Sequence, residues 1–149
     1  MYVDETGCDD RLQREYGWSV RGEPCLDRRV GHATERFSVV AAWQPGSSLI
    51  APLSFDGTCH RRLFELWLRV MLCPTLRKGQ VVILDNARFH RQKAVQRILK
   101  RVGCRALFLP AYSPDLNLIE TQWNSFKTRV CTRRLHGMNL KNAVDAALA

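Results

Sequence analysis

The sequence lacks the features of a membrane-bound or secreted protein. No apolar run approaches the ~20 residues that a membrane-spanning helix needs, and no charged-then-apolar signal segment opens the chain. The six cysteines include no closely spaced pair, which argues against a zinc site and against a redox motif. We therefore expect reduced thiols, no disulfide framework, and a cytoplasmic protein without a membrane partner.

Acidic residues are scarce in one part of the chain. The 149 residues include 23 basic and 14 acidic side chains, for a net charge of +9. Residues 1–85 carry 11 basic and 11 acidic side chains, whereas residues 86–149 carry 12 basic and 3 acidic ones. The net charge therefore lies entirely in the second part, which indicates a polyanionic partner. The length and composition fit a single globular domain, residues 1–149.

Hydrophobic patterning predicts alternating strands and helices. The strands are short apolar or β-branched segments, at 2–5, 36–43, 49–55, 81–84 and 105–109. The helices carry apolar residues at helical spacing, at 60–73, 94–102, 113–130 and 140–149. Turn residues at 44–48 predict an antiparallel hairpin, and the later alternation predicts parallel strands. We expect an α/β fold: a mixed sheet with helices on both faces, and residues 6–35 as a long connection.

Three carboxylates stand where strands or helices begin or end. Asp85 follows the most apolar strand, Asp4 lies at the end of the first strand, and Glu120 borders the apolar face of the helix that follows a proline-containing loop. Each also has an ordinary interpretation: a turn-forming Asp-Asn pair, an exposed residue near the terminus, and a surface glutamate. Three converging carboxylates would suit Mg²⁺ or Mn²⁺ and displacement at phosphorus, with two ions assisting the attacking and leaving oxygens.

Four segments carry a resemblance to a known family. They read YVDETG at 2–7, GWSVRG at 17–22, VILDNARFH at 82–90 and LPAYSPDLNLIETQW at 109–123. Together they resemble the catalytic domain of mariner-like bacterial insertion-sequence transposases, which are DDE superfamily endonucleases. The resemblance spans residues 1–135, and the 34 residues between Asp85 and Glu120 equal the interval of one branch of this superfamily. Leu118 departs from the proline that is usual in the family before the Ile-Glu pair.

The resemblance implies a ribonuclease-H-like fold, with antiparallel strands 1–3 followed by parallel strands 4 and 5. It implies that Asp4, Asp85 and Glu120 form the catalytic, metal-binding triad for Mg²⁺ or Mn²⁺, with two ions. The implied activity is cleavage of DNA at transposon ends and strand transfer into target DNA. A helix-turn-helix DNA-recognition domain, usual at the N-terminus of the family, is expected to be absent from this chain. We therefore expect a homodimer or an assembly with a separate recognition region, associated with the bacterial nucleoid.

Further residues are predicted to flank the site or to contact DNA. By the resemblance, Asn86 and His90 lie beside the carboxylates, although His90 is equally typical of a polar helix N-terminus. Asn117 lies on the same flank of its helix as Glu120. The basic residues predicted to bind DNA, for which a solvated surface is the alternative, are Arg91, Lys93, Lys127, Arg129, Arg133 and Arg134. The tryptophans expected in packed positions are Trp18, Trp43, Trp67 and Trp123.

Two other functions remain open at the level of sequence. The chain is alternatively a catalytically inactive or partial transposase remnant that only binds DNA, an interpretation motivated by the missing recognition domain. A weaker alternative is a receiver-like or phosphatase α/β domain with acidic strand ends, and phosphoryl labelling of Asp4 or Asp85 would support it.

Overall fold

A five-stranded mixed sheet forms the centre of the protein. The computed structural model describes residues 1–12, 18–24, 31–85, 92–110 and 113–149. The sheet order is β3-β2-β1-β4-β5. The strands are β1 (Tyr2–Asp9), β2 (Arg36–Trp43), β3 (Ile50–Asp56), β4 (Val81–Leu84) and β5 (Arg105–Phe108). β1, β2 and β3 are antiparallel neighbours, whereas β4 runs parallel to both β1 and β5. The predicted mixed sheet and its strand directions are confirmed.

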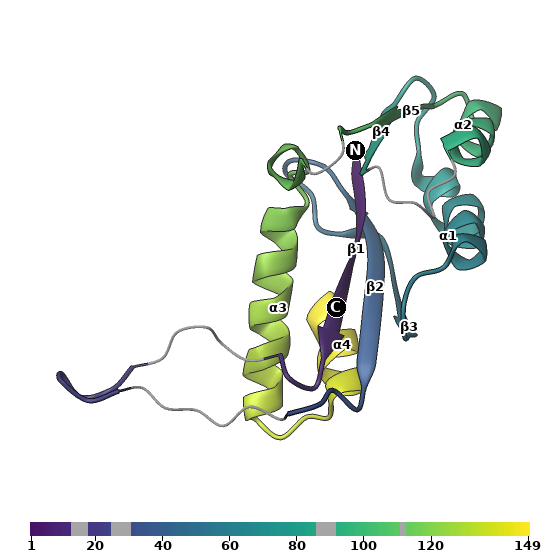
Figure 1. Ribbon diagram of the computed structural model, residues 1–149. Coiled ribbons are helices and arrows are strands. Elements are labelled where there is room, and N and C mark those ends of the chain that lie inside the picture. The colour runs from purple at the N-terminus through teal and green to yellow at the C-terminus, as the bar shows by residue number, and fades with distance from the viewer. Residues whose placement is uncertain (13–17, 25–30, 86–91, 111–112) are drawn as a thin grey trace.

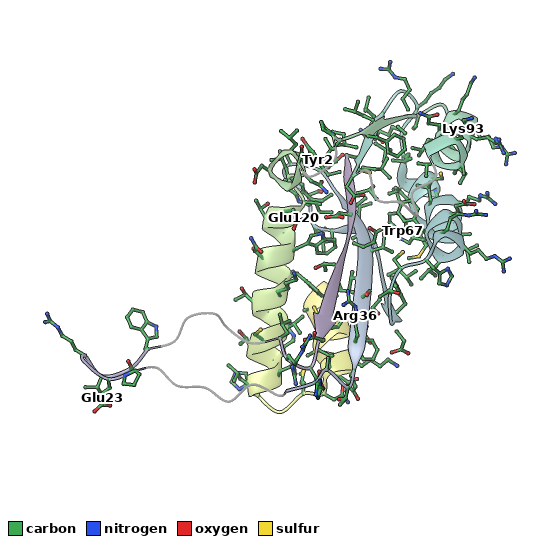
Figure 2. The ribbon with its side chains drawn as sticks, in the orientation of Figure 1. Tyr2, Glu23, Arg36, Trp67, Lys93 and Glu120 are labelled. Atoms are coloured by element: carbon green, nitrogen blue, oxygen red, sulfur yellow. The ribbon has the colours of Figure 1, made fainter. Side chains whose placement is uncertain are left out.

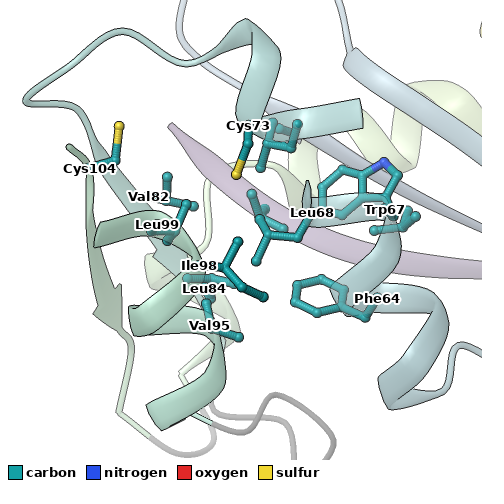
Figure 3. Packing of buried hydrophobic residues seen from close by; sticks show 14 residues of the cluster. Phe64, Trp67, Leu68, Cys73, Val82, Leu84, Val95, Ile98, Leu99 and Cys104 are labelled. Atoms are coloured by element: carbon teal, nitrogen blue, oxygen red, sulfur yellow. The ribbon is translucent and has the colours of Figure 1, made fainter. Parts of the chain in front are cut away.

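Helices cover both faces of the sheet (Figure 1). One layer holds α1 (Arg61–Trp67) and α2 (Gln92–Arg101), and the other holds α3 (Glu120–Leu135) and α4 (Leu140–Leu148). Each layer encloses its own hydrophobic core. Alternation along the strands divides the residues between the cores, so Val40 of β2 packs with the α1 and α2 layer and Val39 with the α3 and α4 layer. Figure 3 shows the first of these cores, where Phe64 of α1 and Ile98 of α2 meet.

The segment predicted as one helix over 60–73 is divided into three. α1 ends at Trp67, a π-helical turn spans Leu68–Leu72, and a 3₁₀ turn spans Cys73–Thr75 around Pro74. The wider π turn rotates the later side chains away from the α-helical pattern. Val70, which the regular spacing placed on the buried face, is therefore 62% exposed, and Leu68 and Leu72 are buried instead.

The helix predicted to start at Ser113 begins later. Pro114–Leu116 forms a separate 3₁₀ turn, and the α-helix starts at Glu120. The amide of Glu120 donates to the carbonyl of Asn117, three residues back, so the chain turns tightly before the helix starts. Leu116, predicted on the apolar stripe, is 52% exposed, whereas Ile119 is fully buried.

The first strand is longer than the sequence pattern suggested. β1 continues to Asp9, so Asp4 lies inside the strand and not at its end, and the long connection starts later than residue 6. β1 pairs with β2 along its whole length, including its polar residues. This pairing extends the strand beyond Glu5, where the hydrophobic pattern predicted its end.

Trp18 was predicted in a packed position, and this prediction is wrong. Residues 18–24 lie away from the body of the domain, as the label of Glu23 marks in Figure 2, and Trp18 is fully exposed. Trp67 and Trp123 are buried as expected, and Trp43 is partly buried.

The described residues contain no helix that is long and apolar enough to cross a membrane. Five of the six cysteines are free thiols in the structure, and Cys25 lies outside the described residues.

Candidate active site

The sheet register places Asp4 beside Asp85. The parallel ladder between β1 and β4 pairs Tyr2 with Ile83 and Val3 with Leu84. The next residues along the two strands are Asp4 and Asp85, and both line one cavity of about 340 Å³. Asp85 follows the last residue of β4, at the carboxyl edge where α/β sheets open into clefts. The two carboxylates, 81 residues apart in the sequence, therefore share one site.

Asp4 is a buried carboxylate, with only 7% of the residue exposed. Its side chain points towards the α3 layer, where its Oδ2 accepts a hydrogen bond from the indole Nε1 of Trp123 at 3.3 Å. The pKa of Asp4 is raised to about 7, mainly by burial; a hydrogen bond from the Glu5 backbone opposes the rise, and the negative charges of Glu5, Asp85 and Glu120 add to it. The ionised form of Asp4 is thus costly unless a cation compensates its charge.

Glu120 reaches the same neighbourhood from α3. It is the first residue of that helix and is exposed, and Figure 2 shows it at the end of α3 that lies near Tyr2 of β1. The charge of Glu120 contributes to the raised pKa of Asp4. Glu120 is nevertheless not among the residues that line the cavity with Asp4 and Asp85.

Asn117 supports the entry to α3. It is 3% exposed, and its carbonyl accepts the amide of Glu120 at 3.0 Å. Its side-chain Oδ1 is buried and has no hydrogen-bond partner within the described residues. Asn117 was predicted to lie on the flank of a helix. It instead lies in the turn that precedes α3, and this turn determines that the helix starts at Glu120.

The cavity contains residues that the sequence pattern did not single out. Arg36, at the start of β2, lines it with Asp4 and Asp85, and its guanidinium lies over Gly7 of β1. A Cβ at Gly7 would approach Arg36 Nη2 to 2.6 Å, so the glycine leaves the space that this guanidinium occupies. Arg36 could have been found only through the pairing of β1 with β2. That pairing places Arg36 at the end of β1 that lies farther from the N-terminus.

Cys59 also lines the cavity, and it is no candidate nucleophile. Burial, the charge of Glu5 and a hydrogen bond with that carboxylate raise the pKa of Cys59 to about 12. The thiol is therefore protonated at neutral pH, and thiolate chemistry is excluded for it.

The carboxylate ligands at the site suit a hard divalent cation, but a complete set of metal ligands is not assembled among the described residues. Carboxylate oxygens are the ligands that Mg²⁺ and Mn²⁺ prefer, and a cation beside Asp4 would offset the cost of ionising that buried group. Across the described ranges, however, no group of three or more His, Cys, Asp or Glu side chains is arranged to hold a metal ion. Asp4 and Asp85 share the cavity, and Glu120 is not gathered with them.

The other predicted site residues are scattered. Asn86, His90 and Arg91 lie outside the described residues. Two of the predicted DNA-binding arginines have partners within the domain. Arg129 Nε donates to the carbonyl of Ala147 at 3.2 Å, and Arg134 Nη1 donates to the carbonyl of Asp10 at 2.7 Å. The remaining three are Lys93, exposed on α2, and the partly buried Lys127 and Arg133 on α3.

The fold is similar to that of several solved protein–DNA assemblies. The Mos1 pre-cleavage transpososome has a TM-score of 0.62 and 18% identity, covering 83% of this chain and 41% of that chain. The Mos1 strand transfer complex has a TM-score of 0.61 and 16% identity, covering 98% of this chain and 49% of that chain. A simian T-cell lymphotropic virus intasome, in complex with a PP2A regulatory subunit, has a TM-score of 0.60 and 13% identity, covering 99% and 45%.

These similarities establish a ribonuclease-H-like fold, in agreement with the sheet order and strand directions. The chain spans less than half the length of the solved chains that it matches. No curated protein sequence matches it. The family described as DDE superfamily endonuclease matches residues 1–139, which is nearly the whole chain. With two aspartates meeting at the carboxyl edge of such a sheet, and a match of this extent, the chain belongs to the DDE superfamily endonucleases.

Proposed function

We propose that this chain is the catalytic domain of a transposase, which cleaves DNA at transposon ends and transfers the cut strand into target DNA. The observation that carries the proposal is the buried Asp4 carboxylate, which shares a cavity with Asp85 and has its pKa raised in part by the charges of Asp85 and Glu120. Repulsion of this kind is unfavourable in the free protein and becomes useful when cations bind.

Asp4, Asp85 and Glu120 are the proposed metal ligands. Divalent Mg²⁺ or Mn²⁺, as two ions, would activate the attacking oxygen and stabilise the leaving oxygen at phosphorus. Trp123 holds Asp4 Oδ2 in place through its indole N–H, and the buried Asn117 fixes the turn from which Glu120 enters α3. Arg36, the basic side chain in the cavity lining, binds a phosphate of the DNA strand beside the carboxylates.

The finer assignments are part of the same proposal. The sequence motifs resemble mariner-like bacterial insertion-sequence transposases, so we assign the chain to a bacterial mobile element that acts on nucleoid DNA. DNA at the transposon ends and at the target is the proposed partner. The protein would act as a homodimer, or together with a separate region that recognises the transposon ends.

Substitution of the carboxylates tests the catalytic assignment. Asp85→Asn and Glu120→Gln should each abolish Mn²⁺-dependent nicking of plasmid DNA, measured on agarose gels. The matched control is Asp145→Asn on α4, where the exposed side chain keeps an oxygen that accepts the Ser54 hydroxyl. The control should cut DNA as the unmodified chain does. Metal-dependent nicking that persists in both site variants would refute the assignment.

The second candidate function is an inactive remnant that only binds DNA. It is favoured by the incomplete grouping of acidic side chains within the described residues. Calorimetric titration with Mn²⁺ in the presence of duplex DNA separates the two candidates. A functional site takes up Mn²⁺ with an affinity that Asp85→Asn lowers by at least tenfold. An inactive remnant binds the DNA but shows no Mn²⁺ uptake that depends on Asp85.

A further inference from the structure

A second cationic site lies between α1 and α2, on the opposite face of the sheet from the side chain of Asp4. Residues of both helices line a groove of about 680 Å³. Among the described lining residues, five are basic and one is acidic, which gives a net charge of +4. The basic residues are Arg61, Arg69, Lys93, Arg97 and Arg101. Figure 2 marks Lys93 on α2 and shows nitrogen-tipped side chains projecting from both helices.

The single carboxylate organises the α1 side of the groove. Glu65 accepts from Arg61 Nε at 3.2 Å and from Arg69 Nη2 at 3.5 Å, one turn of helix before and after it. The Glu65 side chain is 19% exposed, whereas the two arginine side chains are about half exposed. One carboxylate thus holds two guanidinium groups at the groove and leaves most of their positive charge uncompensated.

The α2 side of the groove is a regular row of cations. Lys93, Arg97 and Arg101 follow one another at four-residue spacing, which corresponds to a rise of about 6 Å per step along the helix. Phosphates along one strand of duplex DNA advance about 3.4 Å each along the axis. Because 6 Å is close to twice the phosphate step, the three cations are spaced to contact about every second phosphate of one strand.

The other described lining residues add no polar group to the groove. They are Ala94 and Ile98, both without polar side-chain atoms. None of the described lining residues is aromatic, so the described part of the groove offers no ring on which a base could stack. Recognition there is electrostatic and independent of DNA sequence.

We propose that the α1–α2 groove binds the phosphate backbone of a second segment of duplex DNA, apart from the strand at the carboxylates. The inference rests on the proposed function, because it assumes that the chain acts on DNA. Asp4 points to the α3 layer, while α1 and α2 pack on the other face of the sheet (Figure 1). Among the described residues, the groove and the carboxylate cavity share no lining residue, so they are two separate sites.

The test compares two double variants of the full chain with the same change in charge. Arg97→Gln with Arg101→Gln removes two groove cations. Arg62→Gln with Lys100→Gln removes two exposed cations from the same helices that do not line the groove. Binding to a fluorescent 20-bp duplex is measured by anisotropy at several salt concentrations in EDTA, with circular dichroism as the folding control. A second duplex of unrelated sequence tests for sequence independence.

The groove variant should bind either duplex at least about tenfold more weakly at low salt, and its slope of log K against log salt should be shallower by about two. The control variant should change affinity by less than threefold. Equal losses in both variants, or none in the groove variant, would overturn the proposal. Binding of the same variants to phosphatidylserine vesicles is measured in parallel, and a loss confined to vesicle binding would also overturn the proposal, because it would assign the groove to a membrane surface. Because EDTA suppresses cleavage, these results are independent of whether Asp85→Asn abolishes nicking.

Discussion

Replacing Asp4 with asparagine should stabilise the metal-free protein at neutral and alkaline pH. The carboxylate is buried, and its pKa is raised from the ordinary 3.8 to about 7. Between these two values the unfolded chain ionises Asp4 while the folded chain keeps it protonated. The folded state then binds more protons than the unfolded state, so the free energy of unfolding falls as pH rises from 4 to 7. Above pH 7 the full penalty is present.

The size of the effect follows from the change in pKa. Each unit corresponds to about 1.4 kcal/mol, so a rise from 3.8 to about 7 amounts to roughly 4 kcal/mol on the alkaline side. Asparagine has nearly the same shape, carries no charge, and keeps an oxygen that accepts the indole N–H of Trp123. Asp4→Asn should therefore leave the stability at pH 4 little changed and raise it by a few kcal/mol at pH 8, relative to the unmodified chain.

Urea unfolding in EDTA at pH 4, 6 and 8, followed by tryptophan fluorescence, measures this difference. Asp145→Asn, an exposed carboxylate on α4, is the control and should show no comparable gain between pH 4 and pH 8. A constant difference between Asp4→Asn and the unmodified chain across this pH range would refute the reasoning. Adding Mg²⁺ at pH 8 should reverse the order, because the cation compensates the Asp4 charge in the unmodified chain only.

Two further substitutions test the supports of the fold and of the site. Trp123→Phe keeps an aromatic ring in the core but removes the N–H that donates to Asp4, so we expect the free energy of unfolding to fall by about 1 kcal/mol, and by more at pH 8 than at pH 5. If the same loss is measured in the Asp4→Ala background, the lost hydrogen bond is not its cause. His60 caps α1, because its Nδ1 accepts a hydrogen bond from the Leu63 amide at 3.3 Å, so His60→Ala should lower the free energy of unfolding in urea by about 1 kcal/mol. His60→Asn should restore most of this stability, and failure of that rescue would count against capping.

The sequence was sufficient for the architecture because the strands and helices differ in hydrophobic period. The apolar run 81–84 and the stripe of α2 each occur where the pattern predicts them, and Gly103 ends α2 with a φ of +75°. The pattern failed where contacts at long range decide the structure. Polar β1 residues up to Asp9 are held by pairing with β2, and Trp18 is exposed because none of the described residues packs over it.

The site was predictable in part for the same physical reason. Asp85 could be found because a carboxylate directly after a buried strand stands out against its surroundings. The environment of Asp4 could not, because its burial depends on Trp123 from a helix 119 residues away. Arg36 carried no local signal, since only the register of β1 against β2 brings its guanidinium over Gly7.

The alternation of side chains along β1 links the two proposed DNA sites. Val3 points into the core beneath α1 and α2, and Asp4, the next residue, points to the α3 layer. Because successive side chains leave a strand on opposite faces, Glu5 and Gly7 lie on the face of Val3, where they line the carboxylate cavity together with Cys59. The carboxylate cavity therefore extends onto the same face of the sheet as the α1–α2 groove, and the two sites share no described lining residue. Under the proposed strand transfer, the carboxylate cavity would hold the reacting strand, and the positive charge of the α1–α2 groove would hold a second segment of DNA.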